Sequence, residues 1–139
     1  MKHHLVLRVV SKLLIPFILL FALYVQFHGD YGPGGGFQAG VIFGAGFILY
    51  ALIFGLETAR KVARPAVIRV LVAVGVLIYG GVGVISLLLG GHYLDYSLLA
   101  HVPAHGQHLG IALIEFGVGT TVAAVMITIF FAYAGRGRR

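Results

Sequence analysis

The sequence predicts an all-α integral membrane protein with four transmembrane helices and both termini in the cytoplasm, forming one domain over residues 1–139. Hydrophobic residues make up 60% of the chain and charged residues 10%, and the mean hydropathy is +1.01. Soluble domains carry about 25% charged residues, so a water-soluble globule is not expected. Four apolar stretches come close to or exceed the ~20 residues of a spanning helix, and basic residues lie only at alternate ends of them, near the two termini and in the middle link.

The first expected span covers 9–27. Arg8 and Lys12 lie at its start, where long basic side chains can extend to the lipid headgroups. Pro16 removes a helical hydrogen bond to the Lys12 carbonyl and favours a bend in the first turns. Because no small-residue cleavage site follows, we expect this helix to be retained and not removed as a secretory signal.

The next two expected spans, 37–56 and 70–89, contain no charged residue, and the fourth, 109–134, is long enough to cross ~30 Å of hydrocarbon with tilt. Gly40 and Gly44 form a GxxxG pair on the second span, and Gly117 belongs to a stripe of small residues on the fourth. Such residues let helix backbones approach closely, which is a main source of helix association in lipid. Packing within this chain and packing against other subunits both stay open.

The basic residues predict the orientation. None of the ten Lys and Arg lies in the segments 28–36 and 90–108. Under the positive-inside rule, both termini and the middle link are cytoplasmic. The formal charge of +6 therefore reflects the orientation of the chain in the membrane. We expect the lipid bilayer as a partner and no nucleic acid. The ten residues are Lys2, Arg8, Lys12, Arg60, Lys61, Arg64, Arg69, Arg136, Arg138 and Arg139.

A glycine run opens the second span: Gly34, Gly35 and Gly36 are followed by Phe37 and Gln38. Consecutive glycines allow positive φ and very close backbone approach, and the first N–H groups of the helix lie here. No Gly-Lys-Ser/Thr follows, so the run is not a Walker loop. A flexible loop is one interpretation. Because the run adjoins the hydrocarbon directly, irregular backbone buried against a partner or lining a wet cavity is the other.

Glu115 is the ionisable residue of the fourth span. A carboxylate in the membrane costs about 2.5–3.5 kcal/mol on insertion scales and usually faces a bundle interior or a water path. Its position predicts a place in the outer part of the bilayer. Handling of ions and a purely structural hydrogen-bonding role both stay open. Gln38 and Thr121 are further candidates for an ion path.

Metals and cofactors are not expected. His101, His105 and His108 have a spacing that would share one face of a helix, but Pro103 interrupts the stretch. The chain has no Cys to supply a thiolate, and no HExxH motif occurs. No His falls well inside an expected span, which disfavours a haem held between helices.

Two runs carry a resemblance to a known family. PGGGFQAG at 33–40 opens the second span, and HLGIALIEFGVG at 108–119 opens the fourth. With the size and the four-helix layout, they resemble the B subunit of Mrp-type multisubunit cation/proton antiporters over nearly the whole chain.

The resemblance implies a complex of six or seven different subunits in the bacterial or archaeal cell membrane. Such a complex exchanges Na⁺ or another monovalent cation for H⁺, driven by the proton gradient, and serves pH homeostasis. It implies a transporter subunit and no enzyme. The B subunit would contribute to assembly and to the ion path, with Gly34, Gly35, Gly36, Phe37, Gln38 and Glu115 at the matching motif positions.

Two other functions stay open at this point. One is a purely structural scaffold subunit, in this complex or in a related membrane-bound hydrogenase complex. The other is a small homodimeric multidrug exporter, which also has four helices and a membrane glutamate. We rank it last, because such exporters place the glutamate in the first helix and rely on Trp, whereas this chain has Glu115 in the fourth span and no Trp.

The orientation is tested by single cysteines at Gly32, Ala63 and Ser97, since the chain has none of its own. With an impermeant thiol reagent on intact cells, we expect labelling at Gly32 and Ser97 and protection of Ala63, because the basic middle link is cytoplasmic. Labelling of Ala63 with protection of the other two would reverse the predicted orientation.

Overall fold

A computed structural model of the chain describes residues 4–28, 35–90 and 103–136, with the side chains of all of these except 103–108. Among these residues four helices are long and apolar enough to cross a membrane, which confirms the predicted all-α class and its four spans. A short helix joins the second and third of them. The helices are α1 (Leu5–His28), α2 (Gly36–Phe54), α3 (Leu56–Val62), α4 (Pro65–Leu88) and α5 (Pro103–Ala134).

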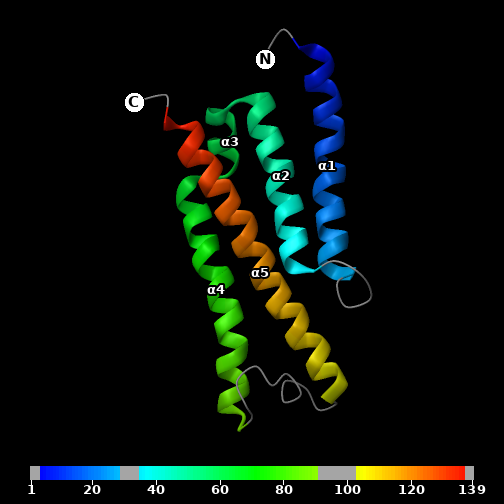
Figure 1. Cartoon of the computed structure of the whole chain (residues 1–139), viewed down its shortest axis with the longest axis vertical. Coiled ribbons are helices and arrows are strands. Elements are labelled where there is room, and N and C mark those ends of the chain that lie inside the picture. The colour runs from blue at the N-terminus through cyan, green and yellow to red at the C-terminus, as the bar shows by residue number, and fades with distance from the viewer. Residues whose placement is uncertain (1–3, 29–34, 91–102, 137–139) are drawn as a thin grey trace.

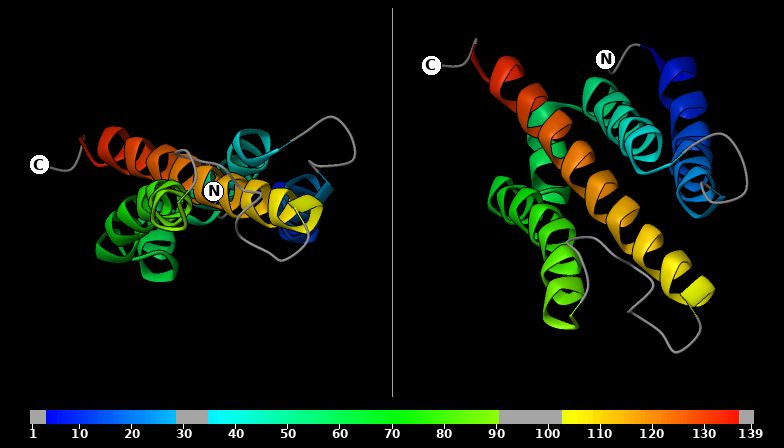
Figure 2. Two further views of the ribbon diagram at one scale, coloured as in Figure 1. Left: turned by 90° about the horizontal axis from the view of Figure 1, so that it is seen from below. Right: turned by 60° about the horizontal axis from the view of Figure 1, so that its bottom comes forward.

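Helix α5 is the central element of the bundle. It packs against both α2 and α4, while α1 packs mainly on α2. Figure 1 shows α5 crossing the molecule obliquely, and Figure 2 shows α4 on one side of it and α1 with α2 on the other. The first residues of α1 and the last residues of α5 lie at the same end of the bundle (Figure 1).

The buried apolar core lies towards that same end. It joins residues of α2, α3, α4 and α5, and α3 contributes Leu56 and Ala59, the latter fully buried. Arg60 follows them, with its Cζ atom 5.7 Å from the centroid of the Phe131 ring. The short helix is thus fixed to the bundle by its inner face. The cluster consists of Ala51, Leu56, Ala59, Ile68, Ala124, Ile127 and Phe131.

The helices differ in extent from the expected spans. The second helix ends at Phe54, because Gly55 has a φ of 101°, and Leu56 already belongs to α3. Pro65 begins α4 in the first-turn position, where its missing N–H has no helical role. We expected Pro103 to interrupt the stretch that holds His101, His105 and His108. It is instead the first residue of α5. Helices α4 and α5 thus begin about one to two turns before the expected spans 70–89 and 109–134. These first turns are less hydrophobic than the spans themselves.

The glycines singled out in the sequence pack within this chain. A Cβ atom on Gly40 would lie 2.7 Å from the Gly119 carbonyl oxygen, and one on Gly44 would lie 3.3 Å from Met126 Cβ. On the other side of α5, a Cβ atom on Gly117 would lie 2.8 Å from the Gly75 carbonyl oxygen. These contacts bring the backbone of α5 against α2 and α4, as small residues do in membranes.

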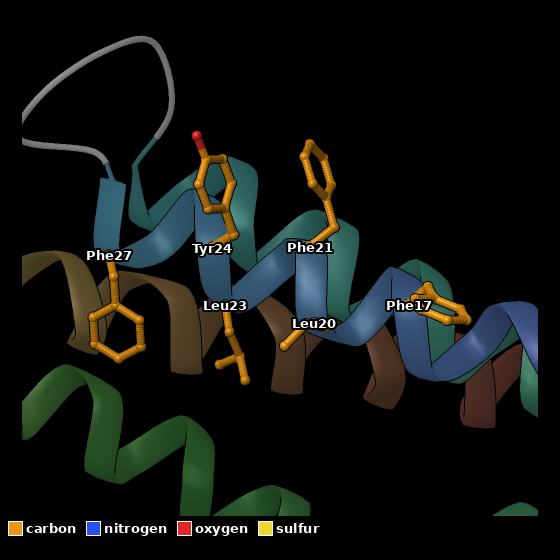
Figure 3. Close-up of a pocket in the computed structure, with 6 residues that line it drawn as sticks. All are labelled: Phe17, Leu20, Phe21, Leu23, Tyr24 and Phe27. Carbon is orange, nitrogen blue, oxygen red and sulfur yellow. The ribbon is translucent and has the colours of Figure 1, made fainter.

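Large apolar side chains cover much of the outer surface, as hydrocarbon surroundings allow. On α1 they form a shallow groove (Figure 3), and several of the side chains are more than half exposed, such as Phe17 at 67% and Phe27 at 74%. Water would not cover such a surface at low cost, which agrees with a helix that spans the bilayer. The groove is lined by Phe17, Leu20, Phe21, Leu23, Tyr24 and Phe27.

The α2–α5 contact is tested by Gly40→Ala against Gly81→Ala. The new methyl group at Gly40 would meet the Gly119 carbonyl and Val122, whereas none of the described residues has an atom within 4 Å of the corresponding point at Gly81. We expect Gly40→Ala to lower the stability of the chain by about 1–3 kcal/mol. Gly81→Ala should be neutral or slightly stabilising, because alanine has the higher helix propensity.

The measurement is thermal unfolding of the purified full-length chain in detergent micelles, followed by circular dichroism. Equal melting temperatures for the two variants would contradict the contact.

Candidate functional site

The backbones of α2 and α5 touch where α2 begins. A Cβ atom on Gly36 would collide with the Glu115 carbonyl oxygen and would lie 2.9 Å from the Glu115 carbonyl carbon. Gly36 is buried. Because no side chain fits between the two helices at this point, a glycine is required there. The contact brings Glu115 of the fourth span to the glycine run of the second, about 80 residues earlier in the chain.

The Glu115 carboxylate lies beside the N-terminus of α2. A Cβ atom on Gly35 would lie 3.2 Å from Glu115 Oε1. Gly35 is the N-cap residue of α2, with φ at 148° and no side-chain hydrogen bond that caps the helix. The first N–H groups of a helix lack helical acceptors and carry partial positive charge. The carboxylate is thus placed where a helix end favours negative charge.

Two amide side chains approach the same junction. Gln38 Oε1 lies 3.5 Å from the Cβ position on Gly35, so it shares with Glu115 the space in front of that glycine. From α1, Gln26 Oε1 lies 2.7 Å from the Cβ position on Gly119, where the Gly36 carbonyl oxygen lies at 3.1 Å. The junction therefore gathers polar groups from three helices. We call this set, Gln26, Gly35, Gly36, Gln38 and Glu115, the polar junction.

The described residues enclose the polar junction only partly. Glu115 and Gln26 are half-buried, and Gln38 is exposed. Phe37 is 60% exposed, so its ring lies on the outer surface and not in the junction. Gly34, the first residue of the glycine run, lies outside the described residues.

A carboxylate with neighbouring amide and carbonyl oxygens can accept a proton or hold a monovalent cation. The oxygen atoms supply negative or partly negative partners for a cation, and the N-terminus of α2 supports the ionised carboxylate when no cation is present. The same residues can equally fix the two helices by hydrogen bonds. The geometry thus brings Glu115 and Gln38 together with Gly35 and Gly36, which the sequence did not predict, and it is compatible with either role of Glu115.

Thr121 lies at a different contact. Its hydroxyl donates a hydrogen bond to the Val72 carbonyl of α4 at 3.4 Å, and it packs against Gly75. A cavity of about 210 Å³ adjoins this contact, with Tyr79 among its lining residues. The contacts of Thr121 with Val72 and Gly75 therefore belong to the α4–α5 interface and not to the polar junction. Thr120 donates to the Phe116 carbonyl of its own helix.

Gln26 is the residue of the junction that the sequence did not single out. The signal that could have found it is an amide side chain within the last turns of an otherwise apolar span. Such a group needs a polar partner in hydrocarbon. Gln38, near the start of the next span, is the other amide side chain at the same junction.

Among the described residues, no group of three or more His, Cys, Asp and Glu side chains is placed to hold a metal ion. His101 and the side chains of His105 and His108 lie outside them. The histidine spacing noted in the sequence therefore stays without a structural description.

Comparison with known proteins points to one family. A family model described as "Domain related to MnhB subunit of Na+/H+ antiporter" matches residues 6–128. The chain is 34% identical over 137 residues to proteins named "Putative antiporter subunit mnhB2" from Staphylococcus aureus strains Newman and COL. The alignment covers 96% of this chain and 96% of each relative.

The contact between Gly35 and Glu115 is tested by Gly35→Ala against Gly55→Ala. Both glycines have positive φ, 148° and 101°, in a region that is almost restricted to glycine, so both substitutions strain the backbone by about 1–3 kcal/mol. At Gly35 the methyl group also meets Glu115 Oε1 at 3.2 Å, whereas at Gly55 no described residue other than its chain neighbours lies within 4 Å. We expect the larger fall in melting temperature for Gly35→Ala.

The control is the same pair of variants in a Glu115→Ala background, where the difference between them should shrink. An equal loss for both variants in the parent chain would show that Glu115 does not crowd Gly35.

Proposed function

The chain belongs to the family of the MnhB subunit of Na⁺/H⁺ antiporters, and on this premise we propose that it is a small membrane subunit of a hetero-oligomeric complex that exchanges Na⁺ or another monovalent cation for H⁺. It is a multi-pass protein of the cell membrane and a transporter component, not an enzyme. Other antiporter subunits are its partners, six or seven different subunits making up the complex. The exchange is secondary antiport driven by the proton gradient, and both termini of this chain are cytoplasmic.

Within the complex, the polar junction is the part of this chain that handles ions. The observation that supports this is the position of Glu115, whose carboxylate is held beside Gly35 and Gln38 by a backbone contact that only glycine permits. An acid held in the membrane by a rigid contact, next to amide oxygens, is suited to taking up and releasing a proton or cation. With cytoplasmic termini, the junction lies in the outer half of the bilayer.

A scaffold role is the second candidate, and one observation favours it. Glycine contacts continue along α2 from Gly36 through Gly40 to Gly44, so the junction is the first of a series of packing contacts. In that case Glu115 serves only to close the helix interface. The family comparisons do not favour the multidrug exporter or the hydrogenase setting.

The two roles are separated by Glu115→Gln and Glu115→Ala. The glutamine variant keeps the shape and hydrogen-bonding capacity of the side chain but cannot ionise, while the alanine variant also loses the contact. For ion handling we expect the glutamine variant to assemble normally yet lose most Na⁺/H⁺ exchange in inverted membrane vesicles, or show an altered pH dependence. Copurification of the other subunits reports assembly.

A scaffold role gives the opposite result: glutamine is tolerated and only alanine loosens the complex. Parental exchange rates and pH dependence in a fully assembled Glu115→Gln complex would rule out ion handling.

A further inference from the structure

Basic side chains gather at the end of the bundle opposite the polar junction. Helix α3, the link after it and the first turns of α4 hold four of them against one acidic residue, Glu57. The Arg60 side chain is directed at its own chain: its Cζ atom lies over the Phe131 ring, and its terminal nitrogen lies 2.7 Å from the Cβ position on Gly135. The other three, Lys61, Arg64 and Arg69, are exposed. We call these three residues the α3–α4 basic surface.

The surface is held in place by the core. Leu56 and Ala59 fix the inner face of α3, and Ile68 fixes the start of α4 in the same cluster. The segment that joins α3 to α4 (Figure 1) is therefore anchored on both sides, and Lys61 and Arg64 belong to it or adjoin it. A charged group on an anchored backbone loses less conformational freedom when it binds an anion than a group on a free tail does.

Exposed apolar residues adjoin two of the basic residues in the sequence. Val62 follows Lys61 and is 66% exposed, and Val70 follows Arg69 and is 59% exposed. At the end of α5, Tyr133 is 68% exposed and Arg136 lies over its ring at 5.6 Å. Cationic groups beside aliphatic and aromatic side chains match the boundary between lipid headgroups and acyl chains. A water-exposed surface or a purely polar partner would leave the valines uncovered.

We propose that the α3–α4 basic surface binds the phosphate headgroup of an anionic phospholipid, with Val62 and Val70 against the first carbons of its acyl chains. Lys and Arg next to a spanning helix attract anionic lipid, and the attraction falls with ionic strength. Phosphatidylglycerol carries the required charge and two acyl chains. The proposal concerns lipid contact and is independent of whether Glu115 handles ions.

The test is photocrosslinking from position 62 in the assembled complex. With Val62→p-benzoylphenylalanine, the complex is reconstituted into vesicles of phosphatidylcholine with phosphatidylglycerol as the minor component, and the adducts on this chain are identified by mass. We expect phosphatidylglycerol adducts several-fold above the share of that lipid in the vesicle. The enrichment should fall to the bulk share in Arg64→Gln/Arg69→Gln and should be kept in Arg64→Lys/Arg69→Lys.

The matched control is Lys2→Gln/Lys12→Gln, which removes the same charge from the N-terminal region and should leave the enrichment unchanged. The proposal is overturned if the parent complex gives the two lipids in their bulk ratio, if the enrichment survives Arg64→Gln/Arg69→Gln, or if the adducts are another subunit and not lipid. Because the adducts are read without measuring exchange, this result is separable from that of the Glu115 variants.

Discussion

The close approach of α2 and α5 is the constraint on which the rest of the structure depends. In lipid, apolar side chains gain nothing by leaving hydrocarbon for a helix interface, so helices associate where their backbones can come close. Here a carbonyl of α5 lies against Gly36, and one turn further along, another lies against Gly40. Since α5 also meets α4 through Gly75 and Gly117, this one helix joins both halves of the bundle. A side chain at any of these positions would force the halves apart.

The same approach explains how a carboxylate is accommodated in an apolar chain. An ionised acid needs a positive or hydrogen-bonding partner in the membrane, and the sequence places no Lys or Arg in the two links at that end. The start of α2 provides hydrogen-bond donors in place of a basic side chain, because its first N–H groups are without helical acceptors. Gly35 allows the approach, since a side chain there would be strained by the positive φ and would crowd Glu115 Oε1. The glycine run and the glutamate are therefore parts of one structural solution.

Much of the fold follows from the sequence, while the pairing of its helices does not. The four spans were predictable because hydropathy is a property of each segment alone, and GxxxG spacing identified Gly40 and Gly44 as packing residues. Which helix they would meet was not predictable, because every neighbour is equally apolar in lipid. For the same reason the contact of Glu115 with Gly35, the approach of Gln26 and the bond from Thr121 to Val72 were not foreseen. Helix α3 was missed because its basic residues were interpreted only as a topology signal.

Exposure at the polar junction bears on why this chain works as a subunit. Glu115 is half-buried and Gln38 is exposed, so the described residues gather the polar groups without enclosing them. An amide left against hydrocarbon costs several kcal/mol, so irregular or polar structure at membrane depth must be covered by protein or line a wet cavity. On the open side of the junction, the described residues supply neither cover. Polar cover on that side completes the junction, and a neighbouring subunit of a larger antiporter is one source of such cover.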